Sequence, residues 1–244
     1  MTPSLPPPLL DVWVYLSGSP LLWLTVTVVA YVIADWISAH SGRNPLVNPI
    51  LLAIALVSGL LFATGTSYRT YFDGAQFVHF LLGPATVALA IPLVRHFGTV
   101  RRMLLPMLAA LVAGSVTAIV SAVGIAALLG APRDVLVALA PKSVTAAIAM
   151  AISRELGGEP ALTAVLVIIT GILGAVSVTP LFNALRIKPW EARGFAVGLA
   201  SHGIGTARAF QVNPVAGLFA GLAMALNAVL TALIVPPLLH LIAH

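Results

Sequence analysis

The sequence contains no cysteine, and this absence removes several kinds of chemistry at once. Without a thiol among its 244 residues, the chain has no disulfide, no thiolate metal ligand and no cysteine nucleophile. Charge is also scarce, because only 8% of the residues are Asp, Glu, Lys or Arg. Soluble domains carry roughly 25% charged residues, so this chain cannot cover a water-exposed surface.

Apolar residues are abundant instead. They make up 60% of the chain, and the mean hydropathy is +1.07. We therefore predict an integral membrane protein, with the lipid bilayer as its solvent. The net charge of +5 would suggest nucleic acid as a partner of a soluble protein. Here Lys and Arg lie mostly in short loops between apolar runs, where they fix topology, so we expect no nucleic-acid binding.

Apolar runs recur along the whole chain, and a helix needs about 20 such residues to span a bilayer. We interpret the proline-rich residues 1–20 as an interfacial lead-in and residues 21–244 as a single membrane domain. The predicted fold class is an all-α polytopic membrane protein with roughly six to eight transmembrane segments. These segments are expected at residues 21–38, 46–64, 77–94, 103–130, 136–154, 161–185, 194–211 and 215–240.

Three of these segments contain helix breakers. Gly83-Pro84 and Pro92 interrupt residues 77–94, Ala140-Pro141 interrupts residues 136–154, and a Gly-rich polar stretch interrupts residues 194–211. Proline removes a backbone donor and clashes with the preceding turn. These segments are therefore expected to be kinked or broken.

The basic loops constrain how the broken segments lie. Loops 95–102 and 186–193 each carry three positive residues, which places both in the cytoplasm. Three full crossings between them would put the loops on opposite sides, so we expect residues 136–154 to enter and leave by one face. By the same count, residues 194–211 dip in from the cytoplasmic side. Two broken hairpins would then meet near the membrane centre, as in secondary transporters.

The first broken hairpin carries a polar island of Pro141, Lys142, Ser143 and Thr145. Proline followed by hydroxyl residues favours a helix start, and a helix N-terminus attracts anions. Lys142 adds a full positive charge, so the island suits a carboxylate ligand. The alternative is a capping turn in which Lys142 extends to the interface.

The second island combines hydroxyl, imidazole and guanidinium groups with glycines. His202 can exchange a proton near neutral pH, which makes it a candidate for proton coupling, or it is a hydrogen-bonded structural residue. Arg208 can hold a carboxylate with a planar fork, or it caps the segment at the interface. The candidate substrate-binding residues of this island are Ser201, His202, Gly203, Gly205, Thr206 and Arg208.

Asn227 adds a polar group to the last apolar run, where it either lines the same cavity or bonds helices together. Histidines are scattered and carboxylates are few, so we predict neither a metal site nor a cofactor. No nucleophile, base and orienting residue converge, and we expect no enzymatic activity.

The islands and their surroundings resemble the LrgB/CidB family. The resemblance extends in collinear order from about residue 46 to the C-terminus, and the pairing of the two islands is its most specific feature. It implies a multi-pass protein of the bacterial inner membrane, linked to programmed lysis and murein hydrolase control. The segments that carry it are residues 81–90, 141–145, 162–165, 171–175 and 200–209.

The resemblance also implies partners and substrates. Family members are usually paired with a small holin-like membrane protein of the LrgA/CidA type, and the family is associated with movement of pyruvate. Plant relatives carry glycolate and glycerate across the plastid envelope. Transport of small monocarboxylates agrees with the cationic, hydroxyl-rich islands.

Two functions from different classes follow. The first is a secondary transporter of small monocarboxylates, with proton coupling at His202. The alternative is an oligomeric holin-like or antiholin-like pore or scaffold, in which the islands only lock helices together. In either case we expect a homo-oligomer, with a dimer favoured.

Overall fold

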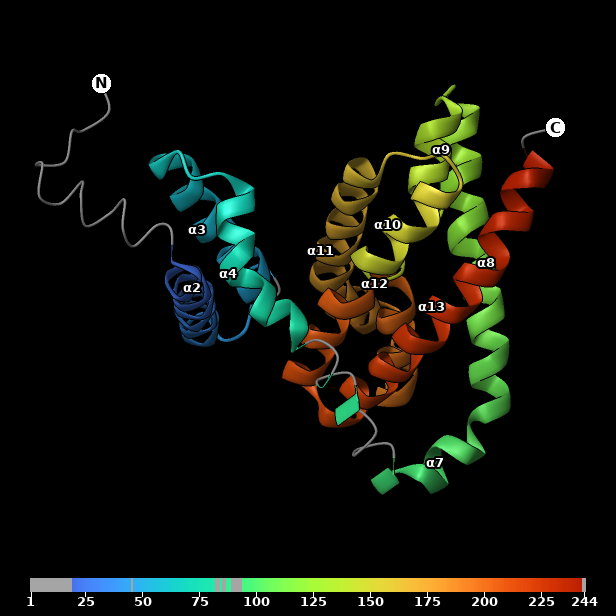
Figure 1. Cartoon of the computed structure of the whole chain (residues 1–244). Coiled ribbons are helices and arrows are strands. Elements are labelled where there is room, and N and C mark those ends of the chain that lie inside the picture. The colour runs from blue at the N-terminus through green and yellow to red at the C-terminus, as the bar shows by residue number, and fades with distance from the viewer. Residues whose placement is uncertain (1–18, 45, 82–83, 85–86, 89–93, 243–244) are drawn as a thin grey trace, which may run out of the picture. The chain divides into compact units, whose positions relative to one another are not determined.

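The computed structural model describes residues 19–44, 46–81, 84, 87–88 and 94–242 (Figure 1). Within these residues every regular element is a helix, which confirms the predicted all-α class. Most of the predicted lead-in lies outside the described residues, as do Gly83 and Pro92 of the third predicted segment. The chain divides into two compact units, Met1–Ala90 and Ile91–His244, and each is described by itself.

In the first unit, helix α2 (Pro20–His40) packs against both α3 (Pro49–Thr64) and α4 (Tyr68–Phe80). Trp23 is fully buried, and Gly74 of α4 approaches it so closely that a Cβ would lie 2.7 Å from the Trp23 Cβ. Beyond the end of α2, Arg43 forms an ion pair with Asp35. The hydrogen bond with Asp35 raises the pKa of Arg43 above its ordinary value.

The second unit contains the remaining helices and both polar islands. Its long spans are α8, α11 and α13, and between them lie shorter or broken helices. Together with α2, these three are long and apolar enough to cross a membrane. The elements in chain order are α7 (Phe97–Arg102), α8 (Leu104–Leu128), α9 (Arg133–Leu139), α10 (Ala146–Glu155), α11 (Pro160–Ala184), α12 (Trp190–Val212) and α13 (Pro214–Ile242).

The predicted break at Ala140-Pro141 is confirmed. Helix α9 ends at Leu139, a turn occupies residues 140–145, and α10 begins at Ala146. Gly158, just beyond α10, lies against Val137 of α9, since a Cβ on it would be 2.7 Å from the Val137 Cγ1. The chain therefore turns back on itself, and we call α9, the turn and α10 the first hairpin.

Helix α12 is also a hairpin, because it consists of two helices that meet at a kink. Its backbone leaves helical geometry at Ser201 (φ −129°, ψ 16°) and His202 (φ 43°, ψ −135°). Before this point, Gly194 lies against Ala216 and Gly198 against Ala220, so this arm runs parallel to α13. After it the order reverses, because Thr206 contacts Met224 whereas Phe210 contacts Gly217. We call residues 190–200 and 203–212 the two arms of the second hairpin.

The two hairpins pack at opposite ends of α8 and α13. At one end, Met107 and Leu111 of α8 form a core with Phe195 and Leu199 of the second hairpin. At the other end, a second core contains residues of α8, the first hairpin and α13: Ile119, Val123, Val137, Ala140, Ile152, Val235 and Leu239. The tips of the hairpins therefore approach the middle of these spans from opposite directions.

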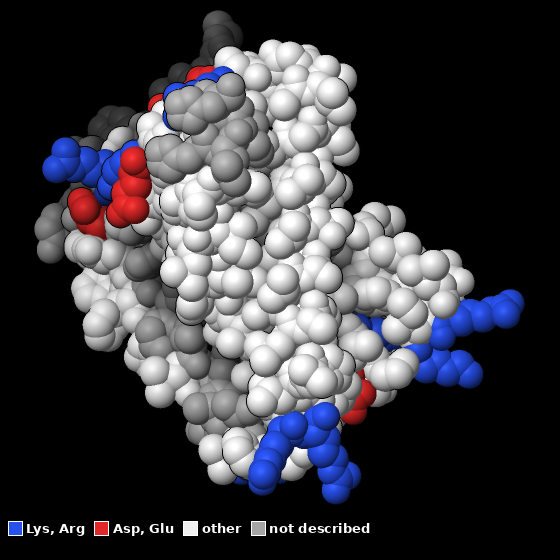
Figure 2. Space-filling view, turned by 90° about the vertical axis from the view of Figure 1, so that its right-hand side faces the viewer, with Lys and Arg blue, Asp and Glu red and all other residues white. Residues whose placement is uncertain are grey.

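The basic loops lie at one end of the unit. Val100 of α7 belongs to the same core as Phe195, so loop 95–102 lies beside the base of the second hairpin, where residues 186–193 also lie. Since both loops are basic, we expect this end to face the cytoplasm. Figure 2 shows that the broad middle of the displayed face carries no charged side chain, as a lipid-facing surface requires.

Candidate functional site

The two hairpin tips meet at Asn227, about halfway along α13. Its side-chain Nδ2 donates to the Ser143 carbonyl in the first tip at 3.3 Å and to the Leu199 carbonyl in the second hairpin at 3.1 Å. Ser143 and Leu199 are 56 residues apart in the chain, yet one amide group binds both. Asn227 is 1% exposed. The predicted meeting of the tips therefore takes place at a single buried side chain.

The hydrogen bond to Leu199 follows from the break in α12. In an unbroken helix the Leu199 carbonyl accepts from the amide four residues later, but the chain leaves helical geometry at Ser201 and His202. A buried carbonyl without a partner is unfavourable by roughly 1–3 kcal/mol. The amide of Asn227 supplies a donor at that place, and so stabilises the broken backbone.

The other half of the Asn227 side chain is also bonded. Its Oδ1 accepts from the Ser115 hydroxyl of α8 at 2.5 Å and from the Thr231 hydroxyl at 3.4 Å. Ser115 and Thr231 are at most 2% exposed. The sequence offered no signal for either of them, because single Ser and Thr residues are common in apolar helices and bond locally.

His202 forms the tip of the second hairpin in an unusual backbone conformation. Its positive φ with negative ψ belongs to a region that glycine tolerates and other residues rarely adopt. The ring Nε2 lies 2.9 Å from the Val167 carbonyl of α11. Since a carbonyl only accepts, Nε2 carries the hydrogen and Nδ1 is the nitrogen left to gain or lose a proton. The Thr206 hydroxyl donates to the His202 carbonyl at 2.8 Å and closes the tip.

Glycines on α11 make room for this tip. A Cβ on Gly171 would lie 2.7 Å from the His202 Cε1, and one on Gly174 would lie 1.6 Å from the Ser201 Oγ. Within the hairpin, Gly205 allows close approach of the two arms, since its Cβ would lie 2.9 Å from the Val197 carbonyl. Gly203 is less constrained, with only the Met224 sulfur within 4 Å of its Cβ position.

We expect Gly174→Ala to destabilise the protein by about 1–3 kcal/mol, because the added methyl overlaps the Ser201 side chain. Gly174→Ala combined with Ser201→Gly should recover most of that loss, since both overlapping Ser201 atoms are removed. Thermal unfolding of the detergent-purified variants measures both effects. Additive destabilisation in the double variant would contradict this contact.

The first tip presents a helix start and a lysine. Helix α10 begins after Thr145, whose side chain forms no capping bond, so the first amides of α10 have no cap from it. The Lys142 Nζ lies 3.4 Å from the Ser143 Oγ, and the neighbouring Pro141 is fully buried. Asn227 bonds the Ser143 carbonyl of the first island and the Leu199 carbonyl, which lies two residues before the second. The two islands thus lie near each other in space.

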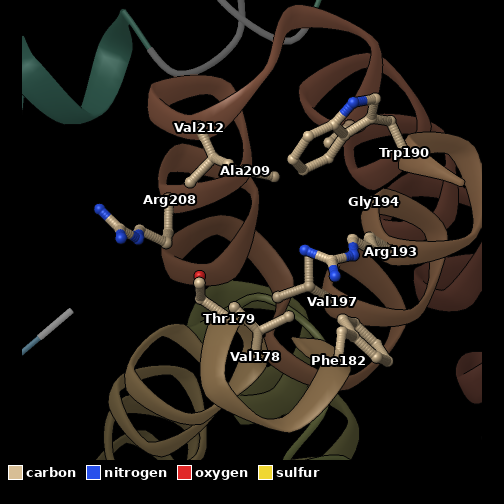
Figure 3. Close-up of a pocket in the computed structure, with 11 residues that line it drawn as sticks. Val178, Thr179, Phe182, Trp190, Arg193, Gly194, Val197, Arg208, Ala209 and Val212 are labelled. Carbon is tan, nitrogen blue, oxygen red and sulfur yellow. The ribbon is translucent and has the colours of Figure 1, made fainter. Parts of the chain in front are cut away.

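Arg208 is separate from this meeting point. It lies nearly two turns beyond His202 and lines a small pocket at the base of the second hairpin with Thr179 and Trp190 (Figure 3). Figure 3 shows it pointing away from Arg193. The pocket volume of about 30 Å³ suits a water molecule and is too small for a carboxylate ligand in this conformation.

Arg193, which lines the same pocket, holds the basic loop in place. Its Nη2 donates to the Asn183 Oδ1 at 2.7 Å and its Nε to the Ile187 carbonyl at 2.6 Å. Its guanidinium also lies 5.2 Å from the Trp190 ring and 6.0 Å from the Phe182 ring. Arg193 therefore joins the end of α11 to the start of α12.

Clusters of histidines and carboxylates were searched for only in the part of the chain that the structure describes. No group of three or more His, Asp or Glu residues is placed there to hold a metal ion.

Comparison with known proteins gives the family. Residues 27–241 match the model of the LrgB-like family. Holin-like protein CidB of Staphylococcus epidermidis is 31% identical over 90% of this chain and 96% of the relative, and CidB of Staphylococcus aureus is 31% identical over 91% and 96%. The protein YwbG of Bacillus subtilis is 36% identical over 88% and 96%. No solved structure is detectably similar. With its apolar spans, the chain is a multi-pass bacterial membrane protein that belongs to the LrgB-like family.

Proposed function

We propose that this protein is a secondary transporter of small monocarboxylates such as pyruvate, glycolate or glycerate. The observation that supports it best is the meeting of two hairpins at Asn227, in the middle of the membrane spans, through Ser143 next to Lys142 and through Leu199, three residues before His202. Sites at the meeting of broken helices are typical of secondary transporters. Two hairpins that enter from opposite faces also give each face its own route to the site.

The carboxylate is bound at the first tip. The start of α10 supplies backbone amides and a partial positive charge, and Lys142 supplies a full one. The hydroxyls of Ser143 and Thr145 add donors, because neither caps the helix. A small acid with one carboxylate matches these donors, because its single negative charge neutralises the single positive charge of Lys142.

His202 is the candidate proton carrier. Its Nε2 is fixed by the Val167 carbonyl, so protonation takes place at Nδ1. Proton uptake there would add a positive charge near the anion, which is how a proton gradient could drive transport. Arg208 stays a candidate for substrate contact nearer the cytoplasmic face, in a conformation with a wider pocket.

The names of the relatives favour a second candidate function. Two of them are called holin-like, which links this chain to control of cell lysis. In this alternative the protein acts as an oligomeric pore or scaffold with a small membrane partner of the LrgA/CidA type. Asn227 then has only a structural role and holds the two hairpins together. Transport and lysis control are compatible, because export of acids alters the membrane gradients.

The two lysines of the chain provide a matched test of transport. Lys142 lies at the first tip, whereas Lys188 is exposed in the basic loop. In proteoliposomes containing the purified chain, we expect Lys142→Met to lower uptake of labelled pyruvate or glycolate at least ten-fold under a pH gradient. Lys188→Met should leave uptake within about two-fold of the unmodified protein. Folding of each variant is checked by thermal unfolding.

The contrary result is equally clear. If the folded protein transports none of these acids, with or without a small holin-like partner in the same vesicles, the transporter proposal is wrong. If Lys142→Met and Lys188→Met lower uptake equally, the first tip is not part of the binding site.

A further inference from the structure

A groove runs along the second unit between α8 and the first arm of α12, and Phe219 of α13 also lines it. Its volume is about 320 Å³. The side chains that line it are apolar, except for the carboxylate of Glu191. None of the residues proposed to bind the carboxylate substrate is among them, so the groove needs an explanation of its own.

The groove extends from the end of the unit that carries the basic loops to the middle of the membrane spans. Met103 and Ala192 line its outer end, and Gly114 lines its inner end. Met103 and Gly114 are eleven positions apart, which corresponds to about 16 Å along a helix. That is roughly half of a bilayer core of about 30 Å, so the groove reaches the depth of the membrane centre.

The inner end of the groove lies beside the meeting point of the two hairpins. Gly114 directly precedes Ser115, whose hydroxyl donates to Asn227. Leu199, which also lines the groove, accepts a hydrogen bond from the Asn227 amide through its carbonyl. The groove therefore connects the basic end of the unit with the place where the hairpins meet.

The side chain of Leu199 covers the inner end. A Cβ on Gly114 would lie 3.0 Å from the Leu199 Cδ1 and 3.1 Å from its Cδ2, so both methyl groups lie against the bare glycine. This contact contains no hydrogen bond, and a leucine side chain can change rotamer. Such a change leaves the hydrogen bond between the Leu199 carbonyl and Asn227 intact. Leu199 can thus uncover the inner end while the hairpins stay joined.

We propose that this groove is an aqueous route from the cytoplasm to the meeting point, and that the Leu199 side chain is its gate. Hydrophobic constrictions close membrane pathways by excluding water, and a leucine packed against a glycine forms such a constriction. The apolar walls suit a route rather than a binding site, because a solute must leave them as readily as it enters. The charge that holds the anion, on Lys142, belongs to the first hairpin beyond the gate.

The charges at the outer end favour water over lipid as the content of the groove. Glu191 lies in the first turn of α12, and an ionised side chain is unfavourable in hydrocarbon. Arg101 and Arg102 are exposed and directly precede Met103 at the same end. Excess positive charge attracts small anions to an opening, so this end fits the monocarboxylates of the proposed function.

The role of the groove in transport rests on the proposed function, whereas the aqueous route and its gate do not. Labelling of introduced cysteines tests both without any substrate, because the natural chain has no cysteine. A route found in a protein that transports none of the acids would contradict transport but not the route. The two failures are therefore distinguishable.

The route is tested with Ala110→Cys, because Ala110 lines the groove. Ala109→Cys is the matched control, since Ala109 is the preceding residue of α8 and is exposed but does not line the groove. Inverted membrane vesicles are treated with a charged, membrane-impermeant thiol reagent. We expect Ala110→Cys to react at least ten-fold faster, because only a thiol in water ionises to the reactive thiolate. Equal rates for the two variants would overturn the route.

The gate is tested with a thiol at the meeting point. Ser143→Cys supplies it and keeps the backbone carbonyl that Asn227 binds. In the same vesicles we expect Leu199→Ala to raise the labelling rate of Ser143→Cys at least ten-fold, because the side chain that covers the inner end is removed. Leu111→Ala is the matched control, since Leu111 is buried in the same core but does not line the groove. An equal rise with Leu111→Ala, or no rise with Leu199→Ala, would overturn the assignment of the gate.

Discussion

Gly198→Leu should prevent the protein from reaching its folded state, whereas Gly124→Leu should be tolerated. A Cβ on Gly198 would lie 2.0 Å from the Ala220 carbonyl oxygen of α13. This neighbour is backbone, so it cannot move aside as a flexible side chain can. Overpacking of a core side chain is unfavourable by about 1–3 kcal/mol, and a collision between backbones exceeds that range.

Gly124 is the matched control because it also lies in an apolar span. Nothing is within 4 Å of its Cβ position, so a leucine there extends into lipid or open space. The measurement is the yield of monodisperse protein from detergent extracts, together with its thermal unfolding midpoint. A Gly198→Leu protein as stable as Gly124→Leu would show that the first arm of α12 does not contact α13 through its backbone.

Maleimide labelling of single-cysteine variants should show that both ends of α12 face the cytoplasm. We expect Lys188→Cys and Val212→Cys to be protected from a membrane-impermeant maleimide in intact cells and to react after permeabilisation. Arg133→Cys and Glu159→Cys, at the base of the first hairpin, should react in intact cells. Because the natural chain has no cysteine, the unmodified protein gives no background signal. All four positions are exposed.

The expected difference in labelling is nearly all-or-none, and its reason is the reversal of the chain at His202. The contacts of Gly194 and Phe210 place both ends of α12 near the start of α13. If α12 crossed the membrane instead, Lys188→Cys and Val212→Cys would react from opposite sides. That result would contradict both the hairpin and the orientation inferred from the basic loops.

Much of the fold could be predicted from short segments of the sequence. The spans at residues 103–130, 161–185 and 215–240 agree with α8, α11 and α13, since length and hydropathy alone decide which segments cross a bilayer. The break at Ala140-Pro141 follows from proline chemistry. The common side of the two basic loops follows from counting charges. None of these inferences needed a contact between distant residues.

The site itself depended on such contacts. Lys142 and His202 were predicted from their polar surroundings, and the structure joins the segments that contain them through Asn227. Asn227 was named as a candidate, but its hydrogen bonds to both tips could not be foreseen. Ser115 and Thr231 were missed, and Arg208 lies apart in its own pocket. Hydrogen-bond partners 28 to 112 residues apart leave no periodic pattern in the sequence.

The sequence by itself therefore determined the solvent, the long spans and the break at Ala140-Pro141, because each depends on the composition of a short segment. Only the tertiary structure decided where the broken backbone finds its hydrogen-bond partners. In an apolar interior without water, every freed carbonyl must find a donor. Which side chain supplies that donor is set by how the helices pack, and here it is the amide of Asn227.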